Sequence, residues 1–248
     1  MKTVHQIFRK SFLAATAILG GFILSNCSND DAATPVNNEE QDAVDAITYS
    51  VSSESNGLAR TMESASAYAD EQAVYTENPA LECGMPYNSN FTDSFSGTNY
   101  SYNYSAARQA ELNCTTEGEP ATLLYSATYS GTYDTPRMAS DDSADASLTI
   151  SGLETTSASV TFTGSYERNG TQVSKIRNQN TFESTLTYSL DSVVFGKTSH
   201  NIESGSAAVT FIGTSSTGNT YNYSGNITFN GDGTATLEIN GNTYTITL

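Results

Sequence analysis

The chain contains no tryptophan, only two histidines, and ten basic residues against 27 acidic ones. This shortage of Lys and Arg gives a formal charge of −17, which repels the phosphate backbone and excludes DNA or RNA as partners. Because histidines are scarce and no Cys-x-x-Cys pair occurs, the sequence predicts neither a metal site nor a bound cofactor. It also lacks a phosphate-binding loop, a dinucleotide fingerprint and an HExxH motif.

An apolar run over residues 12–24 follows a short basic segment and leads directly to Cys27. This arrangement is typical of an export signal, since a membrane-spanning helix needs about 20 apolar residues. The tetrapeptide LSNC at 24–27 resembles the lipobox of bacterial lipoproteins of the Bacteroidota type. The resemblance implies that residues 1–26 are a signal peptide, that Cys27 is lipidated, and that the lipid holds the protein in the outer membrane.

The segment after the cysteine is acidic, reading SNDD at 28–31. It resembles the tag that sends such lipoproteins to the outer face of the outer membrane, which implies a domain facing outside; a periplasm-facing domain is the alternative. Two acyl chains hold a protein to a bilayer where a single chain is marginal. Residues 27–40 have too little apolar content to fold and are predicted to be a flexible tether.

The two remaining cysteines, Cys83 and Cys114, form an even pair in a chain destined for an oxidising compartment. We therefore predict a disulfide between them. Closing a loop of about 30 residues stabilises a fold by roughly 3–4 kcal/mol in the chain-entropy model.

Residues 41–82 are predicted to be a helical segment followed by a loop. Apolar residues recur there at spacings of three, four or seven, which indicates two helices over 41–54 and 58–74, or one helix bent at Gly57. The dipeptide Asn56-Gly57 is a turn signal and separates the two.

Residues 83–248 are predicted to be an antiparallel β-domain, because apolar and polar residues alternate along most of this part. SVTFTGSY at 159–166 is one example, and Asn240-Gly241 is a strong hairpin signal near the end. We expect a mainly β fold of the α+β class: a large curved antiparallel meander or open barrel of about nine or ten strands. One face is apolar and the other rich in Thr, Ser and Asn, so the N-terminal helices are expected to pack on the apolar face.

A search for catalytic groups gives no candidate residue, and we predict a protein that is not an enzyme. The lone His200 lies in a turn-like segment, and the chain has no GxSxG elbow. A glycosidase needs two facing carboxylates, and the sequence does not pair the acidic residues in or beside strands. These are Glu154, Glu167, Glu183, Asp191, Glu203 and Glu238.

Two further patterns concern the polar segments. ASDDSADAS at 139–147 is interpreted as a solvated acidic loop, with a calcium loop as the alternative. Asp142-Ser143-Ala144 and Asp191-Ser192-Val193 resemble the acceptor sequence for O-glycosylation of exported Bacteroidota-type proteins, which implies Ser143 and Ser192 as acceptors.

Together these observations predict a lipid-anchored surface lipoprotein with a non-enzymatic binding or structural β-domain. Its partners would be the membrane, through the lipid, and a glycan, lipid or protein ligand. One alternative is a carrier of lipids or other hydrophobes, with a half-barrel and a helical lid. A second alternative is a hydrolase acting on polysaccharide.

Overall fold

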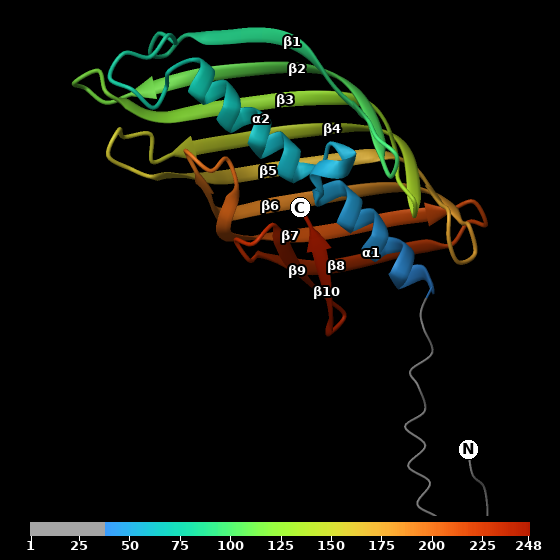
Figure 1. Cartoon of the computed structure of the whole chain (residues 1–248). Helices are drawn as coiled ribbons and strands as arrows, with labels where there is room; N and C mark the ends of the chain where they lie inside the picture. The colour runs from blue at the N-terminus through green and yellow to red at the C-terminus, as the bar shows by residue number, and fades with distance from the viewer. Residues whose placement is uncertain (1–37) are drawn as a thin grey trace, which may run out of the picture. The chain divides into compact units, whose positions relative to one another are not determined.

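The computed structural model describes residues 38–248, which contain one ten-stranded sheet and two α-helices (Figure 1). All strands are antiparallel to their neighbours and follow one another in chain order from β1 to β10. The predicted mainly β meander is confirmed. The sheet stays open, because β1 and β10 form its opposite edges. The strands are β1 Pro86–Ser96, β2 Ser101–Cys114, β3 Pro120–Asp134, β4 Met138–Ser151, β5 Ser159–Ser174, β6 Thr181–Gly196, β7 Ile202–Ser215, β8 Thr220–Phe229, β9 Thr234–Ile239 and β10 Asn242–Thr247.

Two helices precede the sheet, α1 Asn38–Val51 and α2 Leu58–Glu71, with a short 3₁₀ turn between them. The predicted break is found at Asn56, whose φ of 53° is left-handed. Gly57 follows, and a side chain there would lie 2.6 Å from the carbonyl oxygen of Ser50. The first helix begins at Asn38, within the segment predicted to be tether. Neither helix of the described part is long and apolar enough to cross a membrane.

The helices lie across the inner side of the curved sheet (Figure 1). Their apolar stripe is buried against it: Ile47, Leu58 and Met62 have no exposed surface. The sheet contributes tyrosines, phenylalanines and aliphatic residues from alternate positions of β2 to β10, as the period-2 pattern predicts, while β1 adds only the partly buried Phe91. Within residues 38–248 the buried apolar side chains, from Ala43 to Ile246, form a single cluster, so the helices and the sheet share one core as an independently folding domain does.

The predicted disulfide is present. Cys83 lies in the loop after α2, and Cys114 ends β2, 31 residues later in the chain. The bridge therefore joins the linker between helices and sheet to an early strand.

The predicted acidic loop at 139–147 is wrong, because these residues lie inside β4, near the middle of the sheet. Small Ala and Ser side chains alternate with the aspartates there, which lets a hydrophilic segment follow the pleat of a strand. Asp141 and Asp145 point away from the helices and are exposed. Asp142 points toward the helices and is 5% exposed.

Candidate binding surface on the outer face of the sheet

The sheet has a closed side and an open side. We call the side turned away from the helices the outer face. Strand alternation places hydroxyl and amide side chains there, for example Asn103 and Ser105 of β2 and Thr128 and Thr132 of β3. Because the helices cover the inner face, the outer face is the surface of these strands that is available to a ligand.

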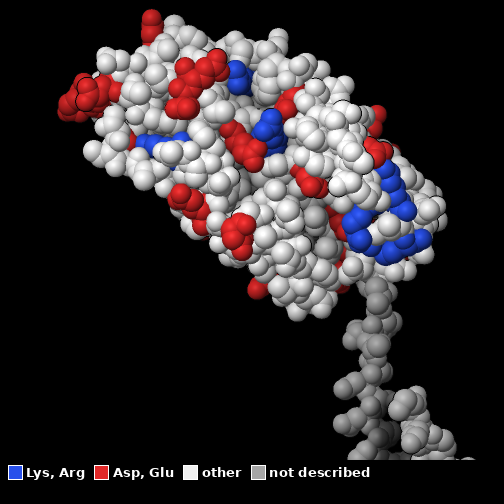
Figure 2. Space-filling model, viewed as in Figure 1, with Lys and Arg blue, Asp and Glu red and all other residues white. Residues whose placement is uncertain are grey.

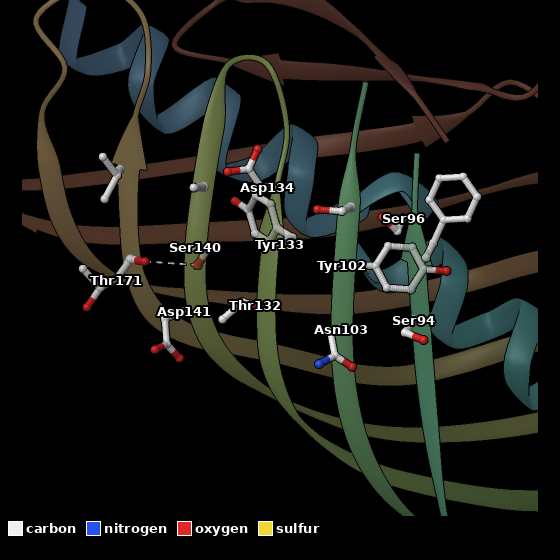
Figure 3. A pocket seen from close by; sticks show the side chains of 14 residues that line it. Ser94, Ser96, Tyr102, Asn103, Thr132, Tyr133, Asp134, Ser140, Asp141 and Thr171 are labelled. Atoms are coloured by element: carbon white, nitrogen blue, oxygen red, sulfur yellow. Dashed lines mark hydrogen bonds between the residues drawn. The ribbon is translucent and has the colours of Figure 1, made fainter. Parts of the chain in front are cut away.

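A hollow of about 700 Å³ crosses β1 to β5 on this face (Figure 3). We call it the outer hollow. Hydroxyl, amide and carboxylate side chains line it: Ser94, Asn103, Thr132, Asp134, Asp141 and Thr171. The Ser140 hydroxyl donates to the Thr171 carbonyl at 3.2 Å and ties β4 to β5 beneath it. Phe95 also borders the hollow, but its ring belongs to the inner side of the sheet, like that of its partner Tyr102 on β2; it is 43% exposed and stacks on Tyr100 with ring centroids 4.6 Å apart.

A second hollow, of about 670 Å³, lies on β1, β2 and β3. Its lining includes Thr92, Ser105 and Ser130, each two residues along a strand from a residue that lines the outer hollow. The two hollows are therefore neighbours on the same three strands. An extended ligand that crosses these strands could contact both.

On the inner face, between the sheet and the helices, lies a buried ion pair. The guanidinium of Arg168 (β5) has its Nε 3.0 Å from Oδ2 of Asp142 (β4), and their side chains are 2% and 0% exposed. The N–H does not point at this oxygen, so the contact is between charges and is not an aligned hydrogen bond. Tyr104 donates to Oδ1 of Asp142 at 2.7 Å and accepts from Nη2 of Arg168 at 2.5 Å.

The same guanidinium holds the break between the helices. Arg168 donates to the Tyr49 carbonyl at 3.4 Å and to the Ser55 carbonyl at 3.0 Å. Ser50 of α1 also shares a short hydrogen bond with Tyr188 of β6. Side chains of the sheet thus provide hydrogen-bond donors for backbone carbonyl groups at the end of α1 and in the turn after it.

Two glycines allow close approach around this pair: Gly170 makes room for the Asp142 side chain, and Gly131 makes room for the backbone of β2. Gly131 on β3 and Gly170 on β5 lie directly opposite Asp142 on either side. A Cβ at Gly170 would lie 2.3 Å from the Cβ of Asp142. A Cβ at Gly131 would lie 2.1 Å from the Asn103 carbonyl oxygen. Any larger residue at these two positions would force the strands apart.

Burial dominates the electrostatics of this cluster. Burial raises the pKa of Tyr104, and the charge of the nearby Arg168 offsets this increase only in part. Burial also raises the pKa of Tyr166 to about 12. Burial alone would lower the pKa of Arg168, but the charge of Asp142 raises it well above its ordinary value. The tyrosines stay neutral and the arginine charged at physiological pH, so the cluster is a fixed structural element sealed from solvent.

Basic residues near the start of α1 are also paired with carboxylates. Figure 2 shows Lys and Arg gathered at the end of the domain where α1 begins. Arg177 contacts Asp42 and Asp45 there, and Arg137 contacts Asp45 at 3.1 Å. These pairs hold α1 to the turn between β3 and β4 and to the turn between β5 and β6. The patch offers a partner few unpaired charges.

The structure separates the predicted site residues. Cys27 lies outside the described residues, while Cys83 and Cys114 form their bridge. Ser143 is exposed on the outer face of β4. Ser192 is exposed at a bulge of β6, with a left-handed φ of 53°. The two serines are thus accessible but belong to different regions.

The acidic residues considered for hydrolysis do not meet. Across the strand pairs of residues 38–248, the register places none of the six opposite another. Two of them have their own polar partners: Glu203 accepts from Ser159 at 2.8 Å, and Glu167 accepts from Asn169. His200 lies in the turn after β6. Within the described chain no group of three His, Cys, Asp or Glu side chains could hold a metal ion.

The sequence interpretation missed the buried pair altogether. Asp142 was assigned to a loop, and Arg168 lies in the polar run ERNG, which carries no sign of burial. The available signal is the pair of glycines at positions 131 and 170, which interrupt strands without ending them. Comparison with protein-family models, with curated proteins and with solved structures found no match for the chain.

We predict that Arg168→Met lowers the free energy of unfolding by about 3–5 kcal/mol, because it leaves the Asp142 carboxylate buried without a counter-charge. The double variant Asp142→Leu, Arg168→Met should recover much of this loss. Denaturant unfolding of residues 38–248 measures both changes.

The matched control is Lys175→Met. Lys175 pairs with Asp134 at 2.6 Å, but at the surface, where such a pair contributes about 0–1 kcal/mol. An Arg168→Met loss no larger than that of the control would contradict a stabilising role for the buried pair.

Proposed function

We propose that the protein is a lipid-anchored, outward-facing lipoprotein of the outer membrane whose outer face binds a neutral, hydroxyl-rich glycan. The observation that carries the binding proposal is the outer hollow. Hydroxyl and amide groups such as those of Thr132 and Asn103 donate and accept hydrogen bonds, as sugar hydroxyls do.

The charges at the outer hollow favour a neutral ligand over an anionic one. Asp134 and Asp141 both line it, and the chain as a whole is acidic. Nucleic acids and phosphorylated polymers would be repelled by this surface. A neutral glycan meets no such barrier, and carboxylates are strong acceptors for its hydroxyl groups.

The carrier alternative has less support. A carrier of hydrophobes needs an apolar space between helices and sheet. Five well-formed hollows of the described residues all lie on the sheet, and no residue of α1 or α2 lines any of them. The inner residues Ile47, Met62 and Tyr188 have no exposed surface, so side chains fill the space where acyl chains would lie.

The hydrolase alternative also finds no specific observation in its favour. Asp134 and Asp141 share the outer hollow, but Asp134 is paired with Lys175 at 2.6 Å. A retaining or inverting glycosidase needs one carboxyl group as a general acid and a second as nucleophile or base. A binding protein without catalysis is the function that the surface supports best.

Binding is tested on a glycan array with residues 38–248, followed by calorimetry on the best neutral glycan. The double variant Asn103→Ala, Asp141→Ala should bind it at least ~10-fold more weakly, because it removes an amide and a carboxylate from the hollow. Asn222→Ala, an exposed amide on β8 away from the hollow, should bind like the parent. Equal affinity of the double variant and the parent would refute this binding site.

The cellular address is tested by protease treatment of intact cells that carry the full-length chain. With Cys27 intact, external protease should digest the β-domain while periplasmic markers survive. Cys27→Ala removes the site of acylation and should strongly reduce the cell-bound, protease-accessible protein. Unchanged accessibility of the variant would contradict a lipid anchor at Cys27.

A further inference from the structure

The two edges of the open sheet are built differently. β10 is six residues long, and α1 lies against it: Glu40 accepts hydrogen bonds from Asn242 at 2.8 Å and from Tyr244 at 2.7 Å. β1 is eleven residues long, pairs only with β2, and forms the upper rim of the sheet in Figure 1. A long uncovered edge is a template for another strand.

The free backbone groups of β1 can be identified from its pairing. In an antiparallel ladder, successive residues alternately bond to the neighbouring strand and point away from it. The N–H of Gly97 donates to the Tyr100 carbonyl, so the odd-numbered residues of β1 face β2. The even-numbered residues from Asn88 to Ser96 therefore turn their N–H and C=O outward. Within residues 38–248, no hydrogen bond uses these outward groups.

The same edge concentrates exposed apolar side chains. Of the six large apolar residues that are exposed in the described chain, three lie on β1 or directly before it: Met85 at 52%, Tyr87 at 36% and Phe95 at 43%. Tyr87 and Phe95 stand four residues before and four residues after Phe91. All three aromatic residues are odd-numbered and belong to the inner side of the sheet.

We propose that β1 pairs antiparallel with β1 of a second copy of this chain, with the two-fold axis at Phe91. In this register Tyr87 of each copy lies opposite Phe95 of the other, and the two Phe91 side chains meet at the axis. Such aromatic cross-strand pairs stabilise a ladder. The outward backbone groups of Asn88, Asn90, Thr92 and Ser94 then bond across the interface, which a symmetric dimer repeats on both sides.

The charge on the edge disfavours a register centred on Asp93. Asp93 is held by Arg60 of its own chain at 2.8 Å, and in the proposed register it lies opposite Ser89. Moving the axis by two residues to Asp93 would place two carboxylates directly opposite each other, which destabilises a strand pair. It would also separate Tyr87 from Phe95.

Sedimentation velocity on residues 38–248 over a concentration series tests the association. The parent chain should be dimeric at the upper end. Thr92→Pro should weaken the dimer at least ~10-fold, because it removes an outward N–H without breaking a bond to β2. Tyr87→Lys should weaken it as well. Thr92→Ala and Ile212→Lys, the latter an equally exposed apolar residue on β7, should leave it unchanged.

Cysteine cross-linking tests the register. Oxidation of Phe91→Cys should give a covalent dimer, because opposed residues at a two-fold axis lie within disulfide distance. Ser89→Cys should give none, since its opposite residue is Asp93. A parent chain that stays monomeric throughout, or a dimer that survives both Thr92→Pro and Tyr87→Lys, would overturn the proposal.

Discussion

The buried pair of Arg168 and Asp142 fixes how the rest of the domain is arranged. A strongly curved sheet has an apolar inner face that must be covered, and the helices cover it only if their break is held in place. Arg168 supplies that hold, since it bonds the Tyr49 carbonyl in α1 and the Ser55 carbonyl in the turn that follows, while it neutralises Asp142 below. Gly170 leaves the space that the Asp142 side chain needs, and Gly131 lets the backbone of β2 approach β3 beside it. Buried charges cost desolvation, so their value here lies in specifying one position for the helices.

Closing the inner face determines which surfaces remain for function. With the helices fixed and the space beneath them filled, the described chain offers a ligand its outer face and offers a partner strand its β1 edge. The outer face follows directly from strand alternation, because every buried Tyr or Leu requires an outward Ser, Thr or Asn beside it. The proposed glycan surface is thus the polar counterpart of the core.

Much of this architecture can be predicted from local pattern. Three local patterns predict the structure correctly, because each depends on neighbouring residues. They are the period-2 alternation in segments such as 159–166, the hairpin signal at Asn240-Gly241 and the break at Asn56-Gly57. The Cys83–Cys114 bridge could be predicted from the even number of remaining cysteines together with the oxidising compartment that the export signal implies. The lipidation of Cys27 lies outside the described residues and stays a prediction.

The remainder depends on contacts between distant residues. Asp142 can be buried because Tyr104, 38 positions away in the chain, and Arg168 contact it from other strands of the sheet. The residues next to Asp142 in the sequence do not predict these contacts. The outer hollow likewise depends on how five strands coil together. Its hydroxyl-rich lining could be predicted from alternation, but its place on the face could not.

Hydrogen exchange on residues 38–248, followed by mass spectrometry, tests most directly whether the helices are a fixed part of the core. If they are, amides of α1 and α2 around Ile47 and Met62 will exchange as slowly as those of β4 to β6, only through global unfolding. Exchange of both helices orders of magnitude faster than these strands, through a low-energy opening, would show a movable lid and contradict the account.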